Sequence, residues 1–398
     1  MSGPLEGLKV LDIATVIAGP FAATLLSDYG ADVLKLELPG KGDGMRAFPP
    51  FKDGKSVWWK AAQRGKQHAT LDLRTDAGRE LFKRLVPQFD VLVENFRPGT
   101  LDRWGLTKEV LWALQPRLVI LRVSAFGQYG PYKDRPGFAR IFEAMGGLTG
   151  ITGHADGEPM HAGVPIGDYI GGLFGAVGIL AALWPRAKDA SLPGEEIDLS
   201  LTEGITRLLD FLPGVHQQLG MVPMRDGNRS PYSAPSAVYR TRDGHWVSMS
   251  GSLDSMFINN CRAIGRSDLA ADRRFANNAS RVRHQQELNR VFSDWCAAHD
   301  LDAVLAAFHG ANGTLSPVYS VAQIVNDPQV RARGSIVSVP DDDFGTLQMP
   351  AVVPRFVGSP SMPGRGAGAV GRDNRAVYGE RLGLSDAQTE ALRADGVI

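Results

Sequence analysis

The sequence has few cysteines, no excess charge and none of the common motifs of metal or serine hydrolases. Its two cysteines, Cys261 and Cys296, are too few for a disulfide framework and form no C-x-x-C pair. Lys and Arg together number 43, and Asp and Glu together also number 43, so the overall charge favours neither nucleic acid nor a membrane as partner. An anionic ligand must therefore be bound by local cations.

Motifs for metal, serine and dinucleotide chemistry are also missing. The chain contains neither H-E-x-x-H nor G-x-S-x-G. His154 and His161 flank a Gly/Pro-rich loop but have no evident third ligand, so we predict no metal site. The loop ATVIAGP after the first apolar run lacks G-x-G-x-x-G, which disfavours a nicotinamide or flavin cofactor.

The first residues, MSGPLEGLKV, have no basic n-region and no apolar h-region. From this and from the scarce cysteines we expect a cytoplasmic protein.

Short β-type runs alternate with helical patterns along the first half of the chain. The 46 glycines and 25 prolines of the whole chain suit many tight turns. This alternation predicts an α/β fold with a doubly wound, Rossmann-like sheet, whose strand ends are the usual place for a ligand. The expected strands are 8–13, 31–37, 69–73, 90–94, 118–124 and 195–200.

Composition divides the rest of the chain. We assign 1–200 to a large α/β domain and 201–225 to a linker, in which 201–220 has a helical pattern that leads away from the sheet. The stretch 223–235 is rich in Pro, Arg, Ser and Asn. A hairpin with its turn at Asp243-Gly244, followed by helical patterns, predicts a smaller α+β domain over 226–327. Residues 328–398 are expected to link back and complete the large domain.

Asp168 stands at the start of an otherwise uncharged, glycine-rich segment, GVPIGDYIGGLFGAVGILAALW. The pattern predicts a buried helix that begins beside Asp168, is stopped by Pro185 and is too short for a membrane span. One role for Asp168 is an ordinary N-cap, which would favour its ionised form. Another, compatible role is that of a nucleophile toward an acyl group, because the surrounding glycines would leave room for a ligand.

Cations and aromatic residues are interleaved at two of the expected strand ends. One stretch is ENFRPG, with Arg103 and Trp104 shortly after it, and the other is GQYGPYKDR at 127–135. Such a mixture can bind a ligand that contains phosphate and adenine, although cations on solvated loops are also common. Glu37, at the end of the second strand, occupies a position where dinucleotide folds often keep a ribose-binding acid.

The chain resembles the family III CoA-transferases, which include formyl-CoA transferase and crotonobetainyl-CoA:carnitine CoA-transferase. The resemblance covers nearly the whole length and rests on six segments taken together. They are LKVLDIATVIAGPFAATLLSDYGADVLKLELPGKGD, ENFRPGTLDRWGL, PRLVILRVSAFGQYGPYKDRPG, MGGLTGITG, GVPIGDYIGGLFGAVGILAAL and DPQVRARG.

The resemblance implies a large α/β domain formed by both chain ends, a small domain between them, and an interlocked homodimer. It places Asp168 on the family's catalytic aspartate and implies coenzyme A as the bound group, entering and leaving as a thioester. The implied CoA contacts are Val16, Arg46, Leu71, Leu73, Arg74, Asn95, Phe96, Arg97, Arg103, Trp104 and Lys133.

Some positions depart from the family pattern. Ile17 replaces the glutamine of formyl-CoA transferase, and Leu38 replaces an arginine found in many relatives, so oxalate and formate are doubtful substrates. The same superfamily contains α-methylacyl-CoA racemases, but their catalytic histidine would align with Phe138, which cannot transfer a proton. A CoA-binding protein without activity is a third hypothesis, which retention of Asp168 disfavours.

We therefore expect transfer of CoA from an acyl-CoA to a carboxylic acid through an aspartyl anhydride and an aspartyl-CoA thioester. Arg46 and Arg140 are candidate anchors for a second carboxylate, which favours dicarboxylates such as succinate or mesaconate, but a surface salt bridge is an equal alternative for Arg140. Backbone N–H groups of Gly146-Gly147 or Gly251 are candidate oxyanion donors.

Overall fold

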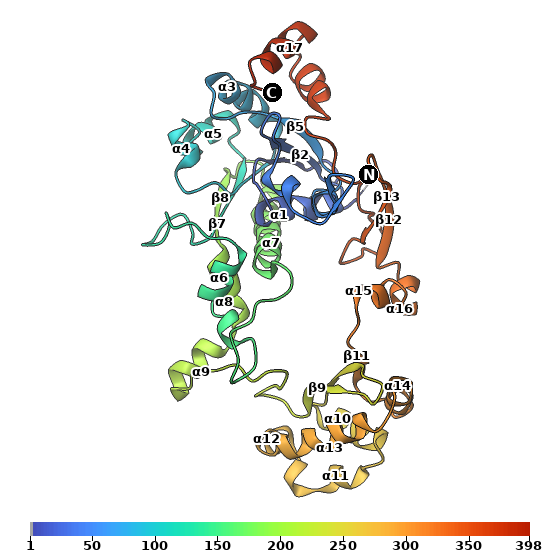
Figure 1. The fold of residues 1–398 in the computed structure, drawn as a ribbon. Helices are drawn as coiled ribbons and strands as arrows, with labels where there is room; N and C mark the ends of the chain where they lie inside the picture. Colours follow the sequence, from blue (N-terminus) through green and yellow to red (C-terminus); the bar gives the residue numbers. More distant parts are fainter. Residues whose placement is uncertain (1–2) are drawn as a thin grey trace. The chain divides into compact units, whose positions relative to one another are not determined.

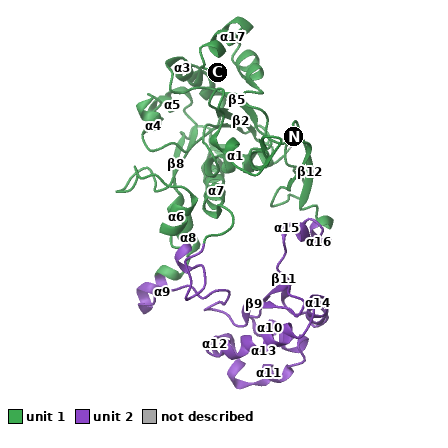
Figure 2. Cartoon of the chain, viewed as in Figure 1, with its two compact units in different colours: residues 1–148, 161–213, 331–398 green, residues 149–160, 214–330 purple. Residues whose placement is uncertain are grey.

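A computed structural model describes residues 3–398. The chain forms two compact units (Figure 2). Unit 1 comprises 1–148, 161–213 and 331–398, and unit 2 comprises 149–160 and 214–330. Both ends of the chain thus belong to unit 1.

Unit 1 contains a six-stranded parallel sheet with the order β5-β2-β1-β6-β7-β8. This order is that of the dinucleotide-binding folds, so the predicted α/β fold with a central parallel sheet is confirmed. Successive strands are added on one side of β1 up to β5 and on its other side from β6 onward, so the strand order reverses between β1 and β6. Figure 1 labels β2, β5, β7 and β8 of this sheet. The strands are β1 Lys9–Asp12, β2 Asp32–Glu37, β5 Gln67–Thr70, β6 Val91–Glu94, β7 Val119–Ser124 and β8 Glu195–Ser200.

The two faces of the sheet are apolar and are covered by different helices. Leu11, Leu34 and Leu92 point into a core shared with α3, α4 and α5, whereas Val10, Val33 and Val91 point into a core shared with α1, α6, α7 and α8. Alternation along the strands therefore fixes the register. The helices are α1 Ala18–Asp28, α2 Val57–Ala62, α3 Asp76–Leu85, α4 Thr100–Arg103, α5 Lys108–Leu114, α6 Ala139–Met145, α7 Ile166–Lys188 and α8 Leu201–Leu208.

The C-terminal part of unit 1 forms a hairpin and then returns to the sheet. The hairpin pairs β12 (Ile336–Asp341) with β13 (Gly345–Pro350). A π-helix, Arg375–Arg381, and α17, Asp386–Ala394, follow. Tyr378 is buried and its hydroxyl donates to the carbonyl of Thr70 at 2.5 Å, so this segment completes the core beside β5.

Unit 2 is a small α+β assembly with a core of its own. Its sheet has the order β11-β10-β9, with β9 Ser236–Arg240, β10 Trp246–Ser250 and β11 Leu315–Pro317. Phe257, Phe292 and Phe308 are buried in its core. The main helices are α10 Asp254–Ala263, α11 Ser267–Ala271, α12 Asn278–Arg283, α13 Gln285–Ala297, α14 Leu301–Gly310, α15 Val321–Ile324 and α16 Pro328–Ala332.

The helical pattern over 201–220, at the start of the predicted linker, corresponds to two helices. Residues 201–208 form α8, and α9 spans Leu212–Leu219. Asp210, with φ of 48°, separates the two helices. The two units meet in sequence at 148/149, 160/161, 213/214 and 330/331. The predicted boundaries lie at 225/226 and 327/328, and the short excursion of 149–160 into unit 2 was not predicted.

Candidate active site

A cavity of about 570 Å³ lies in unit 1 where β1, β6 and β7 end. Its lining residues fall within 15–18, 95–98, 123–125, 133–143 and 162–168, with Phe48, Trp58 and Leu201 in addition. The first two of these stretches directly follow β1 and β6, between which the strand order reverses. Ligands of open α/β sheets bind at this point.

Asp168 lines this cavity from the first turn of α7 (Ile166–Lys188). The residue at the N-cap position is Pro165, which forms no side-chain capping bond, and Asp168 caps no backbone N–H group. The expected capping role of Asp168 is therefore wrong. Its partly buried carboxyl group faces the cavity instead.

Helix α7 also continues beyond Pro185, where we expected it to stop. A proline inside a helix removes one backbone hydrogen bond and crowds the preceding turn. Here the guanidinium of Arg186 donates to the carbonyls of Ala182 (2.5 Å) and Pro193 (2.6 Å). These bonds hold the last turn, so the helix reaches Lys188. By length and composition alone the helix is long and apolar enough to cross a membrane, as core helices of soluble proteins can also be, so the expectation that it is too short is wrong.

Burial, and then the negative charge of Glu143, raise the pKa of Asp168 to about 7. The expectation that the helix terminus would favour the ionised form is therefore wrong. The side chain caps no backbone N–H group, and burial opposes its charge. The ionised form of Asp168 is consequently disfavoured near neutral pH, compared with that of an aspartate in water.

Glu143, on α6, is a cavity residue that the sequence did not indicate. It is only 2% exposed. Its Oε1 accepts the N–H of Gly167 at 3.0 Å, and its Oε2 lies 3.1 Å from Nδ1 of His161. Glu143 thus joins α6 to the segment before α7 and fixes a negative charge beside Asp168.

The glycines of α7 serve helix packing. A Cβ at Gly171 would lie 2.1 Å from Leu201, one at Gly172 would lie 2.9 Å from the carbonyl oxygen of Ala18, and one at Gly175 would lie 2.9 Å from Leu121. Only glycine permits this approach to α1, α8 and the sheet. The space that we expected these helix glycines to leave for a ligand is occupied by their neighbours, whereas Gly163, before the helix, has open space around it and lines the cavity.

Five of the predicted CoA contacts line the cavity with Asp168. They are Val16, Asn95, Phe96, Arg97 and Lys133. Trp104 packs edge-on against Phe96, with ring centroids 5.4 Å apart. Arg103 is the last residue of α4, and its guanidinium donates to the hydroxyl of Thr100, the first residue of this helix, at 2.9 Å.

The other predicted contacts lie outside the cavity lining. Leu71 and Leu73 are buried in the core under α3. The exposed guanidinium of Arg74 is paired with Asp72 at 2.6 Å.

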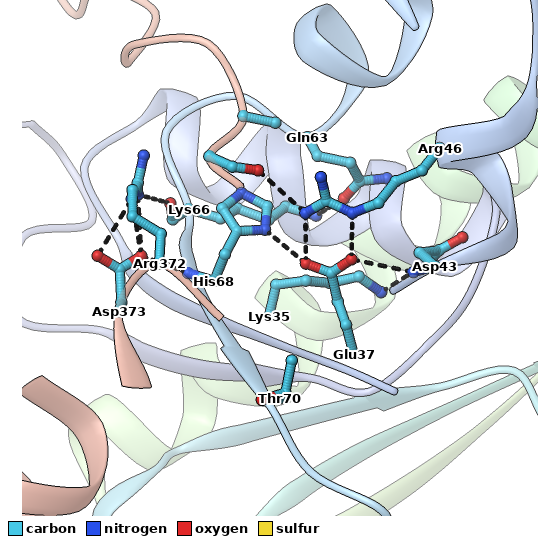
Figure 3. A network of polar contacts seen from close by, with 12 residues as sticks. Lys35, Glu37, Asp43, Arg46, Gln63, Lys66, His68, Thr70, Arg372 and Asp373 are labelled. Carbon is cyan, nitrogen blue, oxygen red and sulfur yellow. Dashed lines mark hydrogen bonds and ion pairs between the residues drawn. The ribbon is translucent and has the colours of Figure 1, made fainter. Parts of the chain in front are cut away.

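Arg46 also lies outside the lining, in a buried polar network (Figure 3). It donates from Nε and Nη2 to the two oxygens of Glu37, at 2.6 and 2.7 Å, and its guanidinium lies 4.1 Å from the centre of the Trp59 ring. Burial opposes ionisation of Glu37, but the bonds from Arg46 and His68 outweigh it and lower the pKa of Glu37 to about 2. The guanidinium of Arg46 is thus already bound by Glu37. The carboxylate oxygens of Glu37 are likewise already hydrogen-bonded, so this side chain is not available to bind a ribose.

The cations that remain available are at the cavity wall. Within residues 3–398, the side chains of Arg97, Lys133 and Arg140 line the cavity and form no ion pair with a carboxylate. Arg135 also lines it and stacks on Tyr132, at 3.6 Å from the ring centre. The cavity therefore combines the carboxyl group of Asp168 with positive charge that no carboxylate pairs.

The candidate oxyanion donors are engaged elsewhere. The N–H groups of Gly146 and Gly147 donate to the carbonyls of Phe142 (2.8 Å) and Ala144 (3.2 Å) at the end of α6. The N–H of Gly251 in unit 2 donates to Pro235 at 2.7 Å. None of the three is free in this conformation.

Across residues 3–398, no three or more His, Cys, Asp or Glu residues are grouped so as to hold a metal ion. Of the two loop histidines, His161 contacts Glu143.

Comparison with known proteins identifies the family of the chain. The profile of CoA-transferase family III matches residues 5–374. The chain is 39% identical over 396 residues to the succinyl-CoA–D-citramalate CoA-transferase of Chloroflexus aurantiacus, covering 99% of this chain and 98% of that one. It is 36% identical to the succinate–glutarate CoA-transferase of Agrobacterium fabrum, covering 86% and 87% of the two chains.

A solved structure has the same fold. The crystal structure of a CAIB/BAIF family protein from Brucella suis matches with a TM-score of 0.83 and 32% identity, covering 96% of this chain and all of that one.

Proposed function

The chain belongs to CoA-transferase family III and is a CoA-transferase, and from this we propose that it moves CoA between dicarboxylic acids by way of Asp168. The observation that supports this most is the cavity itself. It joins Asp168 to unpaired cations at the ligand-binding edge of the sheet.

In the proposed reaction Asp168 attacks the carbonyl of the donor thioester. The C–S bond breaks, which leaves a mixed anhydride on Asp168 and a CoA thiolate. The thiolate then attacks the aspartyl carbonyl, which gives an aspartyl-CoA thioester and releases the donor acid. The acceptor acid attacks this thioester, and the same steps in reverse give the new acyl-CoA and free Asp168.

Two physical effects favour this route. Holding the carboxyl group beside the thioester supplies proximity, up to roughly 7–11 kcal/mol for well-oriented groups. Acylation also makes Asp168 neutral. The shift of its pKa from 3.8 to about 7 corresponds to roughly 4 kcal/mol of disfavoured charge, which formation of the acyl intermediates relieves.

We propose that the thioester end of CoA occupies the cavity, against Val16, Asn95 and Phe96. Arg97 and Lys133 would then neutralise CoA phosphates or a substrate carboxylate. For the predicted positions outside the cavity lining, contact with CoA remains a prediction that rests on the family resemblance alone. These positions are Arg46, Leu71, Leu73, Arg74, Arg103 and Trp104.

Dicarboxylates are the proposed acids. The relatives are named for succinate or succinyl-CoA together with citramalate, glutarate and, for an enzyme of Haloarcula hispanica, mesaconate. Arg140 lines the cavity without an ion pair, whereas Arg46 is held by Glu37. We therefore assign the second carboxylate of the acid to Arg140 and abandon Arg46 for this role.

A homodimer is part of the proposal. The buried side of α7 consists largely of glycines, while Leu173, Val177, Leu180 and Trp184 form a second apolar stripe that is exposed, Val177 at 62% and Trp184 at 66%. An exposed apolar face of this kind marks an interface. We propose that a second copy of the chain covers it and that the dimer works in the cytoplasm without contact with a membrane.

The function is tested with the wild-type protein and mass spectrometry. A panel of donor thioesters is incubated with mono- and dicarboxylic acids, and the acyl-CoA products are measured. Donor thioester alone should also give a CoA-sized, hydroxylamine-sensitive adduct on the peptide that contains Asp168. Turnover confined to long monocarboxylates would refute the substrate class, and an adduct on another residue would refute the role of Asp168.

A further inference from the structure

Val16, in the cavity wall, has an unusual backbone conformation. Its φ is 66°, in the left-handed region that β-branched residues rarely adopt. Its N–H donates to both carboxylate oxygens of Asp43, at 3.1 and 3.2 Å. Lys35 Nζ lies 3.2 Å from Oδ2 of Asp43, and both side chains are almost fully buried (Figure 3). A buried ion pair therefore supports the strained residue.

The backbone on either side of Val16 is held in the same way, by side chains. Asn95 Oδ1 accepts the N–H of Thr15 at 2.6 Å, and Asn95 Nδ2 donates to the carbonyl of Thr15 at 2.7 Å. Gln63 Nε2 donates to the carbonyl of Val16 at 3.3 Å. Strained conformations persist where the surroundings over-determine them, and they gather at functional sites.

This short loop sets the shape of the cavity. Ile17 and Ala18 follow Val16, and both line the cavity with Asp168. The carbonyl of Ala18 is so close to Gly172 of α7 that a Cβ there would lie 2.9 Å from it. A change in the backbone at Val16 would therefore move the wall that faces the start of α7.

We propose that Asp43 is a positioning residue for CoA transfer: with Lys35 behind it, it keeps Val16 in the left-handed conformation that shapes the cavity for the thioester. This inference rests on the proposed binding of the thioester in the cavity. Without Asp43 the loop would relax to ordinary φ values in a fraction of the molecules. The apparent affinity for CoA is then the intrinsic affinity multiplied by the fraction of molecules that keep the left-handed conformation. Enzyme that has bound its substrate reacts at its former rate.

The test compares substitutions at Asp43 and Val16. Asp43→Asn should raise the Kd for CoA and the KM for the thioester on the order of tenfold, with kcat within about twofold of wild type. Adding Val16→Gly should restore most of the affinity, because glycine adopts φ of 66° freely. Adding Val16→Ala, the matched control, removes nearly as much side chain but should restore nothing.

Equal effects of the Gly and Ala changes would overturn the inference, as would an unchanged Kd in Asp43→Asn. Calorimetry with CoA alone keeps this test separate from the choice of acids. Failure of transfer with every acid, with the predicted CoA affinities intact, would refute the substrates and leave the role of Asp43 standing. If Asp43→Asn does not fold, amide hydrogen exchange of the wild type decides: a protected Val16 N–H supports the inference, and exchange at the rate of open loops overturns it.

Discussion

Replacement of Asp168 by asparagine should abolish transfer and, at the same time, stabilise the fold in a pH-dependent way. The pKa of Asp168 rises from 3.8 to about 7 on folding. Between these values the folded chain holds a proton that the unfolded chain has lost, so the free energy of unfolding falls as the pH rises through this window. Asparagine does not ionise, so the Asp168→Asn variant should not lose stability in this way as the pH rises.

The size of the effect follows from the pKa shift. About three pKa units at 1.36 kcal/mol each give a ceiling of about 4 kcal/mol, and residual solvent contact of Asp168 reduces it. Asp168→Asn should therefore match wild type near pH 4 and exceed it by about 2–4 kcal/mol above pH 7. Transfer should fall by several orders of magnitude, whereas CoA binding should persist.

The assay is denaturant unfolding at a fixed protein concentration and several pH values, followed by tryptophan fluorescence. Asp134→Asn, an exposed aspartate in the segment after β7, is the control and should show no pH-dependent gain. A stability difference between Asp168→Asn and wild type that stays constant from pH 4 to pH 8 would refute the argument that burial and Glu143 disfavour the ionised Asp168.

Four further outcomes are expected. Glu143→Gln removes the second cause of the raised pKa of Asp168. The acid limb of the pH profile of kcat/KM should therefore move from about pH 7 to lower pH, by no more than about 1.5 units. A shift of this limb to higher pH would contradict the role of Glu143 in raising the pKa. Arg140→Gln should raise KM for dicarboxylate acceptors about 10–100-fold and leave monocarboxylates unchanged, in contrast to the exposed control Arg393→Gln. Sedimentation at decreasing concentration should show a dimer throughout, and a reversible folded monomer would contradict the interlocked assembly. In deuterated water a 2-methylacyl-CoA should keep its α-proton, because Phe138 is no base; rapid deuterium incorporation would favour the racemase.

The sheet could be predicted from the sequence because each strand is a short apolar run bounded by turn residues. The last strand, Glu195–Ser200, has the predicted limits, and the others differ by a few residues at their ends. The cavity lies at the predicted strand ends, since Asn95 and Phe96 follow β6 directly and line it. Local pattern is sufficient for these features.

Other features depend on contacts between distant residues, so local pattern could not predict them. Nothing in the sequence separates Glu143 from a surface glutamate, because its burial depends on Gly167 and His161, 24 and 18 residues away. Arg46 was a candidate anchor until the structure showed its carboxylate partner. Pro185 was expected to end α7, and only the bonds of Arg186 explain why it does not.

The glycines of α7 link the packing of the fold to the chemistry of the site. Gly171 and Gly172 bring α7 against α1 and α8, so that the first turns of α1 and α7 lie together at the reversal point of the sheet. This proximity places Asp168 beside Ile17 and Ala18 and buries its carboxyl group. Burial is the larger cause of its raised pKa. A bulkier residue at Gly172 would therefore separate the helices, admit water to Asp168 and lower its pKa toward 3.8, so that the carboxylate would be better solvated and a poorer nucleophile.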